Sequence, residues 1–182
     1  MRKVVSGLFV SLDGVVEAPE AWTGPYFSPE VGQTIGALMG SGDTVLLGRV
    51  TYQTFAASFA NDTSGNPMSA QFNAVRKVVV SSTLSSADWQ NSTLVRGDVE
   101  AAVRALKQED GRDINVGGSP TLVSWLAQRG LLDELDLLVF PLVVGHGRRL
   151  FEGEGEQVPL ELVTSEAFST GVVHLRYRLA AG

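Results

Sequence analysis

The sequence predicts an α/β fold in which a mainly parallel central sheet lies between two layers of helices. Through most of the chain, short runs rich in Val, Leu and Ile alternate with longer segments of helical periodicity. This alternation is typical of the β-α units that build a parallel sheet. The last two runs, Leu160–Phe168 and Val172–Leu179, are separated only by Ser169-Thr170-Gly171. They therefore predict an antiparallel hairpin at the end of a three-layer αβα fold.

Length and composition indicate one globular domain over residues 1–182. Apolar residues make up 44% of the chain, which is enough for a buried core. Cysteine is absent and the histidines are His146 and His174, so we expect neither thiol catalysis nor a metal site. A net charge of −6 without a dense basic run argues against nucleic-acid binding. No stretch approaches the roughly 18 apolar residues of a membrane span, and without a secretory signal we expect a cytoplasmic protein.

The first half of the chain contains three predicted strands and two predicted helices. Residues Lys3–Leu12 form a buried strand that ends at Asp13-Gly14. Ser28-Pro29 starts a helix that extends to about Met39, where Gly40-Ser41-Gly42 ends it. The remaining segments are a strand at Thr44–Leu47, a helix from Val50 to about Phe59, a polar loop at Asn61–Pro67 and a strand at Lys77–Val80.

The second half continues the alternation. Asp98 caps a helix, because the apolar residues after it recur at helical spacing until Gly111 ends the segment. Ser119-Pro120 opens another helix, and Gly130 lies beyond its end. The predicted strands of this half before the hairpin are Thr93–Val95, Asp113–Val116 and Leu135–Pro141, and the last is followed by the basic turn Gly145–Arg149.

Small, hydroxylated or cationic residues follow three of the predicted strands. The segments are Gly48–Thr51, Ser81–Thr83 and Gly117–Thr121. In open α/β sheets ligands bind beyond the carboxyl ends of the strands, and two of these segments open helices whose dipoles favour an anion. Together they predict a site for a nucleotide with several phosphates, although each alone also fits a tight turn, an N-cap or a surface loop. Neither a Walker A pattern nor G-x-G-x-x-G is present.

Several stretches resemble a known superfamily. Gly48–Tyr52, Arg76–Ser82 and Val116–Ser119 resemble the dihydrofolate reductase superfamily. Within it, the stretches Ser11–Val16, Gly130–Leu135 and Pro141–Phe151 are similar to the reductase domain of the bifunctional riboflavin-biosynthesis deaminase–reductase. The resemblance covers residues 2–179 and rests on the order and spacing of these stretches. Because the chain has no cysteine for the deaminase zinc site, we expect a stand-alone reductase domain.

The resemblance implies NADPH as the cofactor. Its phosphates would be held by Gly48, Arg49 and Thr51, and its 2′-phosphate by Arg49, Ser81 and Ser82. The residues facing its pyrophosphate would be Gly117, Gly118, Ser119 and Thr121. The backbone around Phe9 and Val16 would meet the nicotinamide carboxamide. Hydride transfer itself is chemistry of the cofactor, and the protein supplies placement and polarity.

The substrate end of the site leaves alternatives open. Asp13 and Glu30 are candidate proton donors, but Asp13 equally fits a turn-shaping role and Glu30 a plain partner of a helix dipole. Three aromatic residues either stack on a planar heterocycle or pack within their own loop, namely Trp22, Tyr26 and Phe27. Arg148 and Arg149 are candidates for a substrate phosphate, or else surface or interface residues.

The sequence therefore predicts an NADPH-dependent reductase of a pyrimidine- or pteridine-like heterocycle. The activity it most resembles is that of 5-amino-6-(5-phosphoribosylamino)uracil reductase of riboflavin biosynthesis. One alternative is a dihydrofolate reductase, which is less favoured because Glu30 does not align with the acid of that family. Another is a nucleotide-binding dimer without catalysis. We expect a homodimer, because the C-terminal strands and residues Leu131–Val144 offer more apolar surface than one sheet face needs.

Overall fold

A computed structural model describes residues 1–153 and 155–180. The strands lie at Val4–Ser11 (β1), Gly42–Gly48 (β2), Arg76–Val80 (β3), Ser92–Val95 (β4), Asp113–Val116 (β5), Glu134–Phe140 (β6), Leu160–Ala167 (β7) and Val173–Leu179 (β8). The helices lie at Pro29–Ser41 (α1), Arg49–Phe59 (α2), Pro67–Ala74 (α3), Val99–Gln108 (α4) and Pro120–Gln128 (α5), and single 3-10 turns lie at Pro19–Ala21 and Gly24–Tyr26.

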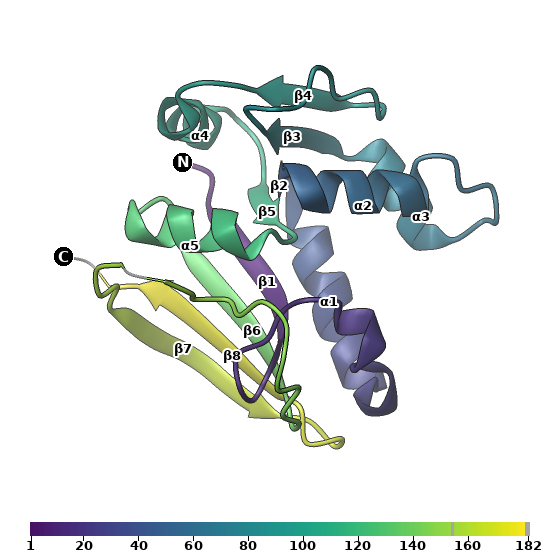
Figure 1. The fold of residues 1–182 in the computed structure, drawn as a ribbon, viewed down its shortest axis with the longest axis vertical. Helices are drawn as coiled ribbons and strands as arrows, with labels where there is room; N and C mark the ends of the chain where they lie inside the picture. The colour runs from purple at the N-terminus through teal and green to yellow at the C-terminus, as the bar shows by residue number, and fades with distance from the viewer. Residues whose placement is uncertain (154, 181–182) are drawn as a thin grey trace.

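All eight strands belong to one sheet in the order β4-β3-β2-β5-β1-β6-β8-β7 (Figure 1). The pairs from β4 to β6 are parallel, whereas β8 pairs antiparallel with both β6 and β7. The predicted α/β class, the mainly parallel sheet and the C-terminal hairpin are confirmed. Since β2, β3 and β5 are adjacent or nearly so, their carboxyl ends lie at one edge of the sheet.

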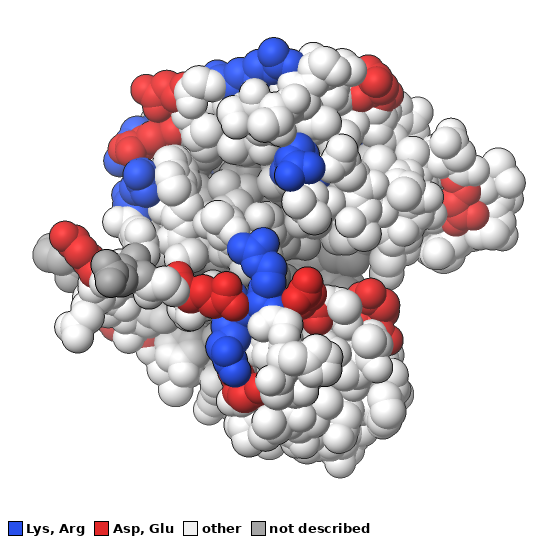
Figure 2. All heavy atoms as spheres, in the orientation of Figure 1, with Lys and Arg blue, Asp and Glu red and all other residues white. Residues whose placement is uncertain are grey.

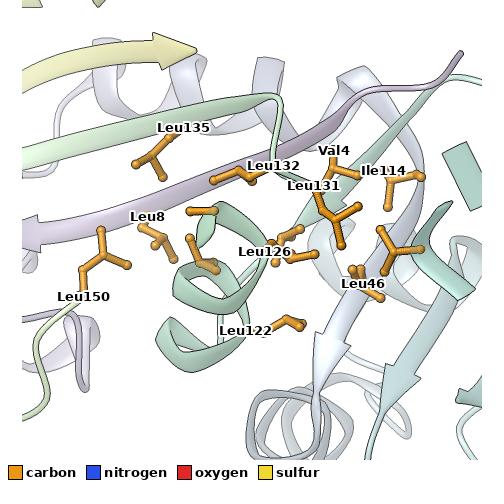
Figure 3. Packing of buried hydrophobic residues seen from close by; sticks show 14 of the residues in the cluster. Val4, Leu8, Leu46, Ile114, Leu122, Leu126, Leu131, Leu132, Leu135 and Leu150 are labelled. Atoms are coloured by element: carbon orange, nitrogen blue, oxygen red, sulfur yellow. The ribbon is translucent and has the colours of Figure 1, made fainter. Parts of the chain in front are cut away.

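The helices cover both faces of the sheet. Leu46 of β2 packs in one cluster with Leu126 of α5 (Figure 3). Val103 of α4 belongs to the same cluster. Leu47, the neighbour of Leu46, points to the other face and packs with Tyr52 of α2. This alternation follows from the period of two along a strand, and it places α4 and α5 opposite α2.

Helix α1 lies on the same face as α2, over β1 and β6. Val31 of α1 is fully buried against Leu138 and Phe140 of β6. Gly7 of β1 allows this close approach, because a Cβ added there would lie only 2.9 Å from Cδ1 of Leu38. The helix is thus held next to the carboxyl end of β1, where Asp13 follows.

Two helices differ from the sequence-based prediction: one was not predicted, and one is longer than predicted. Helix α3 occupies a segment without a predicted element, although Asn66-Pro67 starts it in the same way as Ser28-Pro29 starts α1. Helix α1 continues through Gly40 to Ser41 and leads directly into β2. Gly42 serves strand packing rather than a helix stop, because a Cβ there would lie 2.6 Å from the carbonyl oxygen of Asp113 on β5.

The edge strand β7 carries apolar residues on the surface. Leu162 and Val163 are 54% and 49% exposed, and every residue of β7 after Leu160 is exposed. Residues Leu131–Val144, in contrast, direct most of their apolar side chains into the core of the protein itself. Val143 is the large apolar residue of this region that is mostly exposed, at 68%, and the neighbouring exposed pair Leu162 and Val163 lies on β7. None of the helices in the described part of the chain is both long and apolar enough to cross a membrane.

Candidate functional site

Helices α2 and α5 begin next to each other at the carboxyl edge of the sheet. The amide N–H of Ser119 donates to Oγ1 of Thr51 at 3.0 Å. Gly48 ends β2 so close to α5 that an added Cβ would lie 2.8 Å from the Cβ of Ser119. Gly118 has φ +117°, a conformation that L side chains rarely adopt. The positive ends of two helix dipoles consequently meet at one place, which favours the binding of an anion.

A cavity of about 580 Å³ opens beside this junction, and Figure 2 shows the surface hollowed between α4, α5 and the start of α2. Its size is within the range of roughly 300–1,000 Å³ found for small-molecule sites. One part of the lining consists of Gly48 and of the polar or cationic residues Arg49, Ser119 and Thr121. Another part is apolar and comprises Val80, Val99, Leu122 and Trp125. The remaining lining residues are Gly97, Asp98, Glu100 and Arg129.

The three residues predicted to hold the 2′-phosphate lie in three different environments. Arg49 lines the cavity, and its exposed guanidinium donates to Oε1 of Gln53 at 3.1 Å. Ser81 is buried, and its Oγ accepts the amide hydrogens of residues 83 and 84 at 3.2 and 3.0 Å. Ser82 is exposed in the same turn. The hydroxyl of Ser81 therefore shapes the turn after β3, while Val80 borders the cavity.

The sequence-based reasoning missed the apolar part of the cavity. The guanidinium carbon of Arg129 lies 4.3 Å from the ring centroid of Trp125, and Nε of Arg129 lies 3.8 Å from a carboxylate oxygen of Glu100 on α4. This aromatic and cationic pair forms the wall of the cavity between α4 and α5. A signal for it exists in the sequence, since Trp125 and Arg129 have i, i+4 spacing on a helix that starts at a predicted anion site.

Asp13 fastens the loop after β6 to the loop after β1. One of its carboxylate oxygens accepts from the hydroxyl of Ser11 at 2.6 Å and from the amide of Val144 at 3.0 Å. The other accepts from the amide of Gly145 at 2.9 Å. These bonds, with that of Ser11 the strongest, lower the pKa of Asp13 from 3.8 to about 2.

Glu30 makes a similar connection on the α1 side of the site. Its Oε1 accepts the amide hydrogen of Ser169, in the turn between β7 and β8, at 3.3 Å. Hydrogen bonding to the hydroxyl of Ser28 is the main cause that lowers the pKa of Glu30 to about 2, with Ser169 second. Both predicted proton donors are therefore ionised near neutral pH, and their contacts fit anchoring better than proton donation.

Two of the three predicted substrate-stacking aromatics pack on Phe140 of β6. The ring centroids of Trp22 and Tyr26 lie 5.5 and 6.2 Å from that of Phe140, both in edge-to-face geometry. Phe9, predicted near the nicotinamide, packs in the same way at 5.4 Å. Phe27 is 54% exposed, so its ring is the one of the three that faces solvent most fully.

The basic turn Gly145–Arg149 lies against the loop after β1. The amide of Arg148 donates to Oε2 of Glu17 at 2.8 Å, and its carbonyl accepts the amide hydrogen of Val16 at 2.9 Å. Its guanidinium Nη2 donates to Oγ1 of Thr121 in the first turn of α5, also at 2.9 Å. Arg149 turns the other way, and its Nε donates to the carbonyl of Asp13. Among the described residues, no group of three or more His, Asp or Glu side chains is placed to hold a metal ion.

Comparison with known proteins places this chain in a family. The model of the RibD C-terminal domain matches residues 2–174. The chain belongs to the RibD C-terminal domain family. A relative in this comparison, the uncharacterized protein YyaP of Bacillus subtilis (strain 168), is 28% identical over 97% of this chain and 94% of its own length.

Solved structures confirm the dihydrofolate reductase-like fold of this RibD C-terminal domain protein. A putative riboflavin biosynthesis protein from Shewanella sp. PV-4 has a TM-score of 0.80 at 18% identity, over 98% of this chain and 99% of that one. The dihydrofolate reductase of Enterococcus faecalis, solved in complex with NADP(H), has a TM-score of 0.65 at 14% identity, over 98% and 97% of the two chains.

Proposed function

We propose that this protein is an NADPH-dependent reductase of a pyrimidine- or pteridine-like heterocycle, most like 5-amino-6-(5-phosphoribosylamino)uracil reductase. The observation that carries this proposal is the divided lining of the cavity. The polar part, where α2 and α5 begin, suits phosphate groups, and the apolar part around Trp125 suits a flat base. Membership of the RibD C-terminal domain family and the NADP(H) bound to the Enterococcus neighbour support the proposal.

The residues of the chain fit a dinucleotide at this place. Gly48 and Gly118 let the starts of the two helices pack closely, because an added Cβ would lie 2.8 Å from Cβ of Ser119 and 3.4 Å from Cγ2 of Thr51. The two helix N-termini are thereby brought to one place, which suits a phosphate. Arg49 supplies a cation on the cavity wall, and it is the residue we assign to the 2′-phosphate that distinguishes NADPH from NADH. Thr51 and Ser119 hold the two helices together and thereby hold these groups in place.

The chain itself supplies position rather than acid–base chemistry. When bound, NADPH supplies a hydride for the carbon of a C=N or C=O bond, and the reduction consumes one proton as well. Because Asp13 and Glu30 are ionised near neutral pH, we assign this proton to solvent water and not to either carboxyl group. Asp13 fixes the loops after β1 and β6, while the packing on Phe140 holds the loop that carries Trp22 and Tyr26.

Absorbance at the NADPH band tests the proposed activity. We expect oxidation of NADPH when a ribosylamino-pyrimidine is added, and little when dihydrofolate is added. Oxidation with dihydrofolate alone favours the dihydrofolate reductase alternative, and binding of NADPH without any oxidation favours the non-catalytic alternative. A melting temperature that does not rise with NADPH contradicts the cofactor itself, since ligand at about 100 times its Kd adds roughly 2.7 kcal/mol of stability.

A further inference from the structure

Arg148 connects two parts of the molecule that the proposed function assigns to the nicotinamide and to the pyrophosphate of the cofactor. Its backbone is fixed on both sides to the Val16–Glu17 segment, next to the predicted nicotinamide position. Its side chain reaches Thr121 in the first turn of α5, where we place the phosphates. The residue therefore spans the gap between the loop after β1 and the helix that starts after β5.

The guanidinium of Arg148 has no acidic partner in the described part of the chain, since no carboxylate there lies within 4.0 Å of it. Two of the neighbouring cations differ in this respect. Arg149 lies 3.8 Å from a carboxylate oxygen of Asp13, and Arg129 lies at the same distance from Glu100. Arg148 thus keeps its positive charge and most of its N–H donors available to a ligand.

Thr121, which accepts a hydrogen bond from Arg148, adds a second polar group at this place. The hydroxyl of Thr121 accepts from the guanidinium and keeps its own hydrogen to donate. Both groups stand at the first turn of α5. Pro120 has no amide hydrogen and the amides of Leu122 and Val123 donate to the carbonyl of Ser119, whereas the amide of Thr121 has no acceptor in the described part of the chain. An oxyanion at this turn is offered a guanidinium, a hydroxyl and the amide of Thr121 together, and charge-assisted bonds such as that to the guanidinium are the strong ones.

We propose that Arg148 is a positioning residue that clamps the pyrophosphate of a dinucleotide against the first turn of α5. The inference rests on the proposed function and adds to it a cation from a different loop, 27 residues along the chain from Thr121. Arg148 and Arg49 then have separate tasks, since Arg49 stands at the start of α2. Arg148 holds the pyrophosphate, and Arg49 holds the 2′-phosphate.

Two fragments of the cofactor separate these tasks in a binding experiment. ADP-ribose carries the pyrophosphate without a 2′-phosphate, and 2′-AMP carries the 2′-phosphate without a pyrophosphate. Calorimetric titration measures the affinity of each fragment for the wild-type protein and for Arg148→Ala, Arg148→Lys and Arg76→Ala. Arg76 is the control for loss of positive charge, because it pairs with Glu109 at the opposite end of the sheet.

We expect Arg148→Ala to weaken ADP-ribose by about tenfold or more and to leave 2′-AMP nearly unchanged. Arg148→Lys restores part of the affinity, since it keeps the charge without the planar fork. Arg76→Ala leaves both affinities unchanged.

Equal effects of Arg148→Ala on the two fragments, or no effect on ADP-ribose, overturn the inference while the cofactor proposal stands. A wild-type protein that binds neither fragment overturns both. Melting temperatures of all variants establish that they fold, and if Arg148→Ala does not fold, Arg148→Gln takes its place in the same comparison.

Discussion

Oγ1 of Thr51 accepts the amide hydrogen of Ser119 across 3.0 Å, and this bond joins the first turns of α2 and α5. The two residues are 68 positions apart, and their helices lie on opposite faces of the sheet. Ser119 has φ +46°, which is unusual for a residue other than glycine. The bond therefore holds a strained residue at the point where both helix dipoles converge.

Replacing Thr51 with Val tests the importance of this bond. Thr51→Val keeps the shape of the side chain and leaves the amide of Ser119 without its acceptor, so we expect the free energy of unfolding to fall by about 1–2 kcal/mol. Affinity for ADP-ribose falls as well, because the first turn of α5 loses its support. Urea unfolding and calorimetry measure the two effects. Thr54→Val, on the exposed side of α2, is the matched control, and a similar loss in both variants contradicts the role of the bond.

Gly48 provides a second test of the same junction. The Cβ added by Gly48→Ala would lie 2.8 Å from the Cβ of Ser119, so β2 and α5 must separate. We expect the variant to lose about 1–3 kcal/mol of stability and to bind ADP-ribose more weakly.

The control for this substitution is Gly36→Ala in α1. A Cβ at Gly36 meets open space, and replacement of a helical glycine by alanine stabilises by about 0.5–1 kcal/mol. Opposite signs of the two stability changes, measured by urea unfolding, are the expected result. A Gly48→Ala protein as stable as the wild type shows that the junction is not tightly packed.

Arg49 sets the preference for NADPH over NADH in our proposal. Removing its guanidinium by Arg49→Ala should weaken NADPH by about tenfold and NADH much less, because a charged hydrogen bond to the 2′-phosphate is lost. Gln53→Ala removes the neighbour that accepts from Arg49 and leaves the cation in place, so it serves as the control. Kd values for both nucleotides decide the question. Equal weakening of NADPH and NADH contradicts the assignment.

Asp13 links stability to acidic pH. Its folded pKa of about 2 lies below its ordinary value of 3.8, so its stabilising effect is complete above that value and is lost as pH falls through about 2. We therefore expect Asp13→Asn to be less stable than the wild type at neutral pH, with the difference shrinking on acidification. Urea unfolding over a pH series measures this difference.

The low pKa of Asp13 also predicts how kcat/KM depends on pH. An ionised Asp13 does not titrate near neutral pH, so the kcat/KM profile of the wild type should show no ionisation attributable to it. If Asp13→Asn removes an inflection near neutral pH, Asp13 is a proton donor after all, and its role as an anchor is incomplete.

We propose that β7 forms the contact between two copies of this protein. It is an edge strand of the sheet, as β4 is at the other side, and it exposes Leu162 and Val163. An unpaired edge of this kind pairs with a second strand across a two-fold axis. Light scattering should give twice the mass of the chain. Val163→Lys should reduce this to the mass of one chain without loss of fold. A monomeric wild-type protein refutes the proposal.

Local signals in the sequence predicted most elements of the fold. The capping pairs at Ser28-Pro29 and Ser119-Pro120 and the helical spacing after Asp98 marked three helices that the structure contains. Helix α3 was missed because it is short and weakly amphipathic, and its start at Asn66-Pro67 lies in a polar segment. The order of the strands in the sheet was not predicted, because it depends on pairings between distant residues.

In the candidate site, too, the features local to the sequence were predicted and those that depend on distant contacts were not. The glycines and hydroxyl residues at the strand ends were found from the sequence because each is local to one strand–helix junction. The wall formed by Trp125 and Arg129 was not found, since it exists only where α5 packs beside α4. Arg148 and Arg149 are equivalent in the sequence, and only the folded chain gives them different partners.

The sequence by itself determined the α/β class, the hairpin at the end of the chain and the presence of glycine, hydroxyl and arginine side chains after three strands. These properties depend on the period of apolar residues and on caps within a few positions of each other. The tertiary structure decided that the starts of α2 and α5 meet, that Asp13 and Glu30 bind the amides of distant turns, and that Arg148 reaches Thr121. Each of these depends on contacts between residues far apart in the chain, which form only when the sheet assembles.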